Sequence, residues 1–396
     1  MTLLKSLYEL DTWIEQESFL GWDPHDALNS RLLHFLTFNN RRLGQMWVQL
    51  LKRSPVNFRR LLGVPKGYNP KGMGLFLTTY ARRYGQLGDL QDLEKTLFFA
   101  DWLEENVTIG FHGSCWGYNF DWPNRGFFAL AGSPTVVNTV FISLGFLALD
   151  EAFQQQGQSS DRGLRVAKSA CQFILNDLQR YNETDDELCF SYTPLDSRWV
   201  HNASVLGGQL LSEVASRTSD GEMKIIAQKV ARFTARRQRS DGAWPYGTAS
   251  RDSWVDNFHT GFVLNSLKKI SENLHTNEFD EQISKGYIFW KNNFFLTDGT
   301  PKYLYDRIYP IDAHSIAQAV LTFLAFADQD PDAINWASRI ANWGILHMQD
   351  RSGYFYYQIH RGYINKIPYI RWSQAWMQRA LTEFVLHTIG EKIEQV

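Results

Sequence analysis

The stretch Thr135-Val-Val-Asn-Thr-Val-Phe-Ile-Ser-Leu-Gly-Phe-Leu-Ala-Leu149 contains no charged residue on any face. A helix of this composition is buried on all sides. Residues 222–238 differ, because Ile226, Val230 and Phe233 follow at steps of four and three while lysine and arginine occupy much of the rest. The first segment therefore predicts an inner helix, and the second predicts an outer helix with one face in solvent.

This alternation occurs six times along the chain. Bends rich in glycine and aromatic residues separate outer from inner segments, as in Asp241-Gly242-Ala243-Trp244-Pro245-Tyr246. The copies are roughly 50 to 75 residues apart, which is longer than the repeats of most open solenoids. We predict outer helices near 31–53, 90–106, 162–180, 222–238, 278–294 and 331–348, and inner helices near 72–85, 135–152, 202–216, 257–272, 312–327 and 371–388.

An unbroken repeat favours one all-α domain, a closed ring of six helical hairpins spanning residues 1–396, with residues 1–30 as an N-terminal helical extension. Two helix starts carry capping signals, since Ser133-Pro134 and Asp330-Pro331 each place a capping oxygen before a proline. A closed ring has one central cavity. Functional groups are therefore expected at its mouth.

The composition argues against several classes of partner. With 40 basic and 42 acidic residues the net charge is -2, which gives no electrostatic case for nucleic acid or an anionic membrane. The first residues lack the apolar core of a signal peptide, so we expect a cytoplasmic protein. Cys115, Cys171 and Cys189 have no metal-ligand spacing and are interpreted as small core residues.

Unusual polar residues gather in the bends and in the first turns of the inner helices. Three histidines open three successive inner helices, whereas caps alone need no histidine neighbour. This coincidence predicts one functional rim. Its members are Asp121, Asn124, Arg125, Asp196, Arg198, His201, Asn202, Arg251, Asp252, Asp256, Asn257, His259, Asp306, Arg307, Asp312, His314, Tyr369, Arg371 and Gln374.

Two carboxylates in this set open neighbouring inner helices. Packed helices lie about 8–10 Å apart, so Asp256 and Asp312 are expected within the ~5–9.5 Å used to attack a glycosidic bond. One would act as acid and the other as base. His259 follows Asp256 by three residues and would share its helix face, whereas His314 follows Asp312 by two. We therefore predict catalytic roles for Asp256, His259, Asp312 and His314.

Aromatic residues supply the second part of the predicted site. Phenylalanine, tryptophan and tyrosine make up 15% of the chain, and many lie in the bends. Flat rings with polar tips bind the apolar faces of sugars, while nearby polar groups bind the hydroxyls. The predicted substrate-binding residues are Asp121, Trp122, Tyr192, His201, Trp244, Tyr246, Trp254, Asn257, Tyr309, Arg371 and Gln374.

The six repeats, the aromatic bends and three segments resemble the six-hairpin glycosidase superfamily. These segments are Ser253–Phe262, Tyr309–Ser315 and Ile370–Met377. More narrowly, the chain is similar to a prokaryotic group associated with polysaccharide genes, and distantly to unsaturated glucuronyl hydrolases and N-acylglucosamine 2-epimerases. The resemblance covers nearly the whole chain. It implies an (α/α)6 toroid, short β-like aromatic bends at one rim and a carbohydrate site, but not one particular reaction.

A second resemblance concerns the Gln-x-x-x-Gly-x-Trp/Phe motifs of terpenoid cyclases and prenyltransferases. Residues 238–244 and 349–355 match this pattern, which ties an outer helix to the next bend. The chain lacks the Asp-x-Asp-Asp acid motif and a zinc-ligand set, which argues against prenyl chemistry.

The sequence favours a carbohydrate-active enzyme that hydrolyses glycosidic bonds, without cofactor or metal. A sugar epimerase using His201, His259 or His314 is the first alternative, and a non-catalytic glycan-binding protein is the second. The expected partner is a carbohydrate substrate, and the sequence predicts no oligomeric state.

Overall fold

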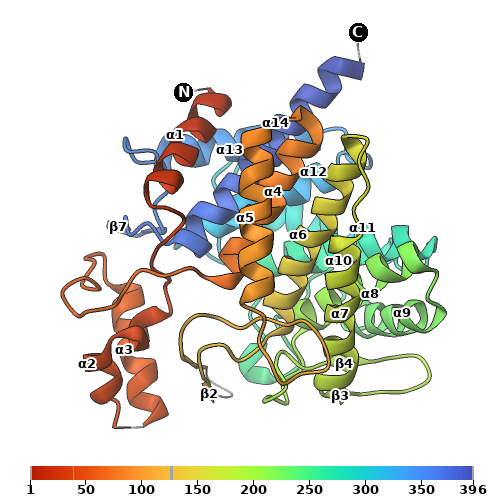
Figure 1. Ribbon diagram of the computed structural model, residues 1–396, viewed down its shortest axis with the longest axis horizontal. Coiled ribbons are helices and arrows are strands. Elements are labelled where there is room, and N and C mark those ends of the chain that lie inside the picture. The colour runs from red at the N-terminus through yellow and green to blue at the C-terminus, as the bar shows by residue number, and fades with distance from the viewer. Residues whose placement is uncertain (1, 39, 125–127, 395–396) are drawn as a thin grey trace.

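The computed structural model describes residues 2–38, 40–124 and 128–394, without the side chains beyond residue 390. Its centre is a closed ring of six inner helices. Each inner helix packs on the next, and the last returns to the first (Figure 1). The ring consists of α4 (Pro70–Leu87), α6 (Val136–Gln155), α8 (His201–Thr218), α10 (Asn257–Leu274), α12 (Ala313–Ala325) and α14 (Trp376–Glu394), the last preceded by a π-helical turn η3 (Ile370–Ala375). The predicted toroid is confirmed.

Five outer helices follow the predicted positions closely. They are α5 (Leu90–Glu105), α7 (Arg162–Asp177), α9 (Gly221–Ala235), α11 (Asp280–Asn293) and α13 (Ala333–Met348). Their charged faces point outward, while one stripe of each packs on the ring. Two predicted helix starts are two residues early, because the residues before α6 and α13 are Thr135 and Asp332 rather than Ser133 and Asp330.

The sixth outer helix is α1 (Leu3–Gln16), and not the predicted segment 31–53. Leu7, Leu10 and Ile14 of α1 belong to the main hydrophobic core. Asp11 fixes the helix further, since its carboxylate pairs with Arg83 of α4 at 2.7 Å and accepts a hydrogen bond from Gln378 of α14 at 2.7 Å. The first residues of the chain therefore complete the ring.

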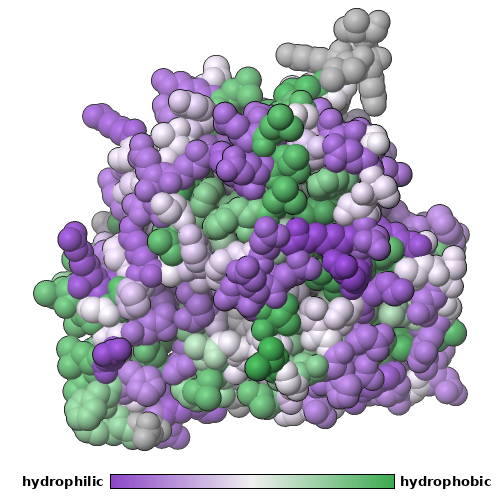
Figure 2. All heavy atoms as spheres, viewed as in Figure 1, coloured by the Kyte–Doolittle hydropathy of each residue, from purple (hydrophilic) through white to green (hydrophobic). Residues whose placement is uncertain are grey.

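Residues 31–53 form part of a separate small lobe. It contains η1 (Asp26–Asn29), α2 (Arg31–Phe35) and α3 (Arg41–Arg53), visible at the lower left of Figure 1. The apolar stripe of α3 is real, but Val48 and Leu51 pack on a local cluster with Leu28, Leu33 and Val64. An apolar stripe shows that a helix packs on other apolar side chains, but it does not show which hydrophobic core the helix joins. The prediction of an outer helix at 31–53 was wrong for this reason. The lobe also exposes Leu32, Phe35, Phe38, Leu50 and Leu61, and Figure 2 shows apolar surface at this corner.

The aromatic bends form short antiparallel ladders at the end where the inner helices start. In Figure 1, β2, β3 and β4 lie together below the helices. The pairs are β1 (Trp122–Pro123) with β2 (Phe128–Ala129) and β3 (Arg180–Tyr181) with β4 (Cys189–Phe190), and a three-stranded sheet contains β5 (Ile311–Asp312), β6 (Gln358–His360) and β7 (Tyr363–Asn365). These ladders hold the start of each inner helix against its bend.

The two Gln-x-x-x-Gly motifs tie an outer helix to the following bend, as the sequence indicates, and also to the next outer helix. Gln238 Nε2 donates to Gly242 O at 3.0 Å and to Gln282 O, just inside α11, at 2.8 Å. In the last repeat, Gln349 Nε2 donates to Gly353 O at 2.8 Å and to Ser6 O of α1 at 2.9 Å. The same motif therefore joins the end of the chain to its beginning.

Gly353 lies directly against the backbone of α1. A Cβ atom at this position would lie 2.2 Å from Glu9 O, so nothing larger than glycine fits. Replacing Gly353 with alanine is expected to lower the free energy of unfolding by about 1–3 kcal/mol more than Gly132→Ala. Both glycines have positive φ, 102° and 82°, so backbone strain is matched, but no atom lies within 4 Å of a Cβ at Gly132.

Urea unfolding measures this difference, and proteolysis in residues 17–24 reports release of α1. Equal losses in the two variants would contradict the docking of α1 on this bend.

The longest strongly apolar helix, α6, is a core helix of the ring. Among the described residues, α6 alone is long and apolar enough to cross a membrane, and 78% of its most apolar stretch is buried inside the protein. Cys115, Cys171 and Cys189 are free and buried, as expected of small core residues.

Candidate active site

A cavity of about 140 Å³ lies inside the ring where the inner helices start. Every inner helix contributes to its wall through a residue at or near its first turn, and the aromatic bends supply much of the remainder. The helical contributors are Lys71, Val137, Asn202, His259, His314 and, from η3, Arg371, and the bends add Tyr118, Phe120, Trp122, Tyr192 and Tyr246. The volume is below the ~300–1,000 Å³ typical of drug-sized sites, which restricts the occupant to a small molecule.

His259 is oriented by a carboxylate. Its Nδ1 lies 2.7 Å from Asp256 Oδ2, and its backbone N–H donates to Asp256 Oδ1 at 2.9 Å, so Asp256 both caps α10 and fixes the ring. Trp254 Nε1 donates to the same carboxylate at 3.1 Å. Because Asp256 holds Nδ1, the Nε2 atom of His259 is left for a ligand in the cavity. The i, i+3 spacing predicts this arrangement.

His314 is a buried imidazole without a hydrogen-bond partner in the described part of the chain. Its ring is stacked between Phe258, at a centroid distance of 4.4 Å, and Trp376, at 4.5 Å. Only 2% of the residue is exposed, and neither Nδ1 nor Nε2 is bonded. Burial lowers the pKa of His314 well below its usual value, and the charges of Lys71 and Arg371 lower it further, so the ring is neutral at neutral pH.

Arg371 is anchored by a buried ion pair. Its Nε and Nη2 donate to the two carboxylate oxygens of Asp23 at 2.6 and 2.9 Å. Burial, the largest single cause, would raise the pKa of Asp23, but the charge of Arg371 and the hydrogen bonds from His25 and Arg371 together outweigh burial and lower the pKa. Asp23 also holds His25, whose Nδ1 lies 3.3 Å from Oδ1. Burial and the charge of Lys52 lower the pKa of His25 to about 4.

Lys71 is a second buried cationic group in the wall. Its Nζ lies over the rings of Phe141, Trp376 and Phe262, at 4.4, 5.3 and 5.7 Å from their centroids. The described residues give Nζ no ion pair. Burial lowers the pKa of Lys71 well below its usual value, and the charge of Arg371 adds to the effect. The cavity can therefore present Lys71 and Arg371 to an electron-rich oxygen.

Asp312 caps α12 behind the wall, with both carboxylate oxygens occupied. The backbone N–H of His314 donates to Oδ1 at 2.8 Å, Gln358 donates to Oδ2 at 2.6 Å, and Trp372 Nε1 lies 3.0 and 3.2 Å from the two oxygens. Burial raises the pKa of Asp312 to about 6, although these donors oppose the shift. Asp256 and Asp312 are thus both engaged outside the central cavity.

The raised pKa of Asp312 makes folding stability depend on pH. The folded protein holds a proton at Asp312 between about pH 4 and 6, where the unfolded chain has released it, so this contribution to stability is lost as pH rises through that range. Asp312→Asn cannot titrate. The free energy of unfolding of Asp312→Asn, relative to that of the native protein at the same pH, is therefore expected to be about 2 kcal/mol higher at pH 7 than at pH 4.5.

Urea unfolding at the two pH values measures this change, with exposed Asp241→Asn as the control. A constant difference between Asp312→Asn and the native protein would contradict the burial of an ionisable group at this position.

The other predicted residues are divided between the cavity and its surroundings. Trp122, Tyr192, Tyr246, His259, His314 and Arg371 line the central cavity, whereas His201, Trp244 and Asp256 line a small adjoining space of about 10 Å³. Burial, with Arg237, lowers the pKa of His201 to about 4. Arg125 lies outside the described residues.

The remaining predicted side chains have structural partners. Asp121 accepts from Ala131 N and pairs with His34, and Asn257 bonds Trp290 and Lys302 O. Gln374 bonds both backbone groups of Phe355. Trp254 is stacked on Tyr246, and Tyr309 is 41% exposed. These residues support the rim. Sequence position near an inner helix start does not distinguish such supporting residues from cavity-lining ones.

The wall residues that sequence reasoning missed include His25, Lys71, Phe258 and Trp372. Lys71 stands in the first turn of the first inner helix, so the repeat itself could have identified it. His25 comes from the small lobe, and no repeat signal places that lobe against the ring. Among the described residues, no group of three or more histidine, cysteine, aspartate or glutamate side chains is arranged to hold a metal ion.

No protein-family model and no curated protein matches the chain. Solved structures do. The cellobiose 2-epimerase from Bacillus thermoamylovorans B4167 aligns with a TM-score of 0.64 and 12% identity over 82% of this chain and 90% of that chain. An unsaturated glucuronyl hydrolase specific for heparin aligns with a TM-score of 0.59 and 12% identity, over 84% of this chain and 89% of that chain. The Lin0763 protein from Listeria innocua aligns with a TM-score of 0.61 and 11% identity, over 98% of this chain and 99% of that chain.

The chain shares the fold of the six-hairpin glycosidase superfamily. Identities of 11–12% show the fold alone. Because this fold is found in both an epimerase and a hydrolase, the reaction has to be argued from the residues of this chain.

Proposed function

We propose that this protein is a carbohydrate-active enzyme that moves a proton at the carbon next to the carbonyl group of a small reducing sugar, which epimerises or isomerises it. One observation carries the proposal. His259 and His314 reach the central cavity with nitrogen atoms free to accept or donate a proton, whereas both carboxylates expected of a hydrolase are occupied behind the wall.

The two imidazoles suit opposite roles. His314 is neutral and unbonded, so it can take the proton from the sugar carbon. The electron pair of the broken C–H bond then moves into the carbonyl group and forms an enediolate. His259, backed by the Asp256 carboxylate, is suited to hold a positive charge and to return a proton from Nε2. Return to the same carbon gives an epimer. Return to the former carbonyl carbon, together with movement of the hydroxyl proton from O2 to O1 of the enediolate, gives the isomeric ketose.

The rest of the wall supports the same chemistry. Arg371 and Lys71 can stabilise the negative oxygen of the enediolate. Tyr118, Trp122 and Tyr246 provide flat surfaces with polar tips for a sugar ring or chain. A cavity of about 140 Å³ also suits a free sugar better than a polysaccharide. These features favour proton transfer over the hydrolysis that the sequence indicates.

The reaction is tested by incubating the protein with free hexoses, N-acyl hexosamines, uronates and disaccharides, and separating the products. We expect a new epimer or ketose without an increase in reducing ends. New reducing ends from an oligosaccharide or an unsaturated uronide would favour hydrolysis instead. Binding without a product would favour a glycan-binding protein.

A further inference from the structure

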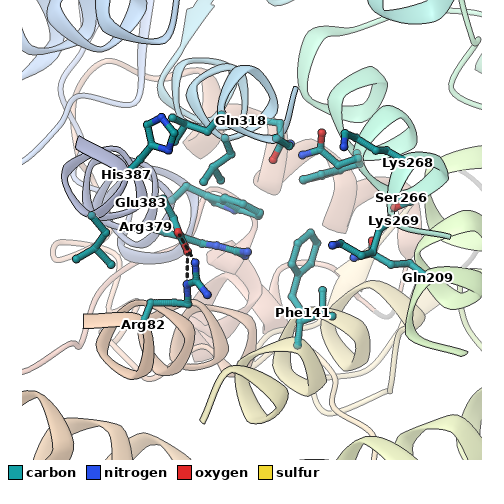
Figure 3. A pocket seen from close by; sticks show the side chains of 18 of the residues that line it. Arg82, Phe141, Gln209, Ser266, Lys268, Lys269, Gln318, Arg379, Glu383 and His387 are labelled. Atoms are coloured by element: carbon teal, nitrogen blue, oxygen red, sulfur yellow. Dashed lines mark hydrogen bonds and ion pairs between the residues drawn. The ribbon is translucent and has the colours of Figure 1, made fainter. Parts of the chain in front are cut away.

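A second and larger cavity opens at the opposite end of the ring. Its volume is about 580 Å³, and it lies among the later turns of the inner helices (Figure 3). Its apolar wall includes Phe141, Phe262 and Trp376. The rings of these three residues also face Lys71, which lines the first cavity. An aromatic partition, made of Phe141, Phe262 and Trp376, therefore separates the two cavities.

Arg379 is the one arginine or lysine of this cavity to which the described residues give no ion pair. Its Nε and Nη1 are buried without a hydrogen-bond partner, and its side chain points into the space in Figure 3. The ring of Trp376 lies 5.8 Å from the guanidinium carbon. Burial lowers the pKa of Arg379 from its usual range. An unpaired buried cation is costly unless a ligand supplies the negative charge.

The other charges of the cavity are already neutralised. Arg82 Nε pairs with Glu383 at 3.4 Å, Lys269 pairs with Glu272 at 2.6 Å, and Lys268 pairs with Glu272 at 2.6 Å and with Asp328 at 3.1 Å. The acidic groups are therefore shared by these cations. A net positive charge remains at Arg379.

Other polar groups in the wall of the same cavity suit a hydroxylated molecule. Asn265 Oδ1 is buried and has no hydrogen-bond partner among the described residues, so it can accept a hydrogen bond. Gln209 also lines the cavity and accepts from Ser266 at 2.9 Å, and Gln318 reaches the space from α12. Together with the aromatic partition, these groups match a ring or short chain that carries hydroxyl groups and one acidic group.

We propose that this second cavity binds a small organic anion, a sugar acid or sugar phosphate, whose acidic group pairs with Arg379 and whose body rests on the aromatic partition. A bound anion would contact Trp376 from the side of the second cavity. Trp376 is also stacked on His314 at a centroid distance of 4.5 Å, so a ligand that moves Trp376 would also move His314 in the first cavity.

Calorimetry with glucose 6-phosphate and glucuronate tests the site, with uncharged glucose as the reference. We expect at least one anion to bind, more weakly as salt is raised, and at least tenfold more weakly to Arg379→Met. Arg379→Met should not lower the melting temperature of the ligand-free protein, because it removes an unpaired buried charge. Arg165→Met, on the exposed face of α7, controls for the loss of one positive charge.

Two further variants locate the anion. Asn265→Asp places a negative charge in the wall of the same cavity and should weaken anion binding at least tenfold, whereas Lys71→Met should preserve it. Binding that survives in Arg379→Met but is lost in Lys71→Met would place the anion in the first cavity and overturn the proposal. Absence of binding of both anions to the native protein would also overturn it.

Discussion

Replacing His314 with phenylalanine is expected to reduce kcat by at least ~10²-fold while the protein stays folded. Phenylalanine keeps the stacking between Phe258 and Trp376 and removes two ring nitrogens that have no partner in the described chain. Loss of unbonded buried polar atoms should leave the melting temperature unchanged or raise it. A combined loss of activity and gain of stability is therefore the signature of a proton-transfer residue.

The control for this variant is His347→Phe. His347 is also stacked on a tryptophan, Trp343, at 4.4 Å, but it lies on an outer helix. Turnover by His347→Phe should equal that of the native protein. Full activity in His314→Phe would show that His314 serves only to pack the ring.

Asp256→Asn is expected to lower kcat by about 10²–10⁴-fold with little change in KM. An asparagine still caps α10, because asparagine is as good a capping residue as aspartate. What it loses is the charge that orients His259 Nδ1 at 2.7 Å and stabilises the protonated ring. The kcat should also lose part of its pH dependence, which a purely structural role would not change.

Asp220→Asn is the matched control, since Asp220 caps the outer helix α9 in the same way, far from the cavity. Asp312→Asn provides the decisive contrast. In a proton-transfer enzyme it should retain much more activity than Asp256→Asn, whereas a hydrolase with paired carboxylates should lose nearly all turnover in both.

The fold could be predicted from the sequence because its repeat is strong. Charge-free and charge-rich helices alternate, and the Gln-x-x-x-Gly motifs mark where each outer helix meets its bend. The sixth outer helix was predicted wrongly because the segment closest before the first inner helix, 31–53, was assigned as its outer partner, whereas α1 is the sixth outer helix. The ring closes between the first helix and the last repeat, and this closure rests on contacts such as those of Gln349 and Gly353 with α1.

The candidate site could be predicted less completely. Position near the start of an inner helix singles out His259, His314 and Arg371, which line one cavity, but it equally singles out Asp121 and Asp312, which do not. It could not show that Asp312 is turned away and saturated, because that depends on Gln358 and Trp372 from other elements. Nor could it supply Asp23 and His25, which reach the ring from the small lobe without any periodic signal.

Solvent exchange at carbon tests the proposed reaction most directly. The protein is incubated in deuterated water with the sugar that it converts, and proton and deuterium NMR locate any label. We predict one deuterium at the carbon next to the carbonyl group or at the former carbonyl carbon, absent in His314→Phe and greatly slowed in Asp256→Asn. Turnover without deuterium on carbon, with a new reducing end instead, would contradict the account.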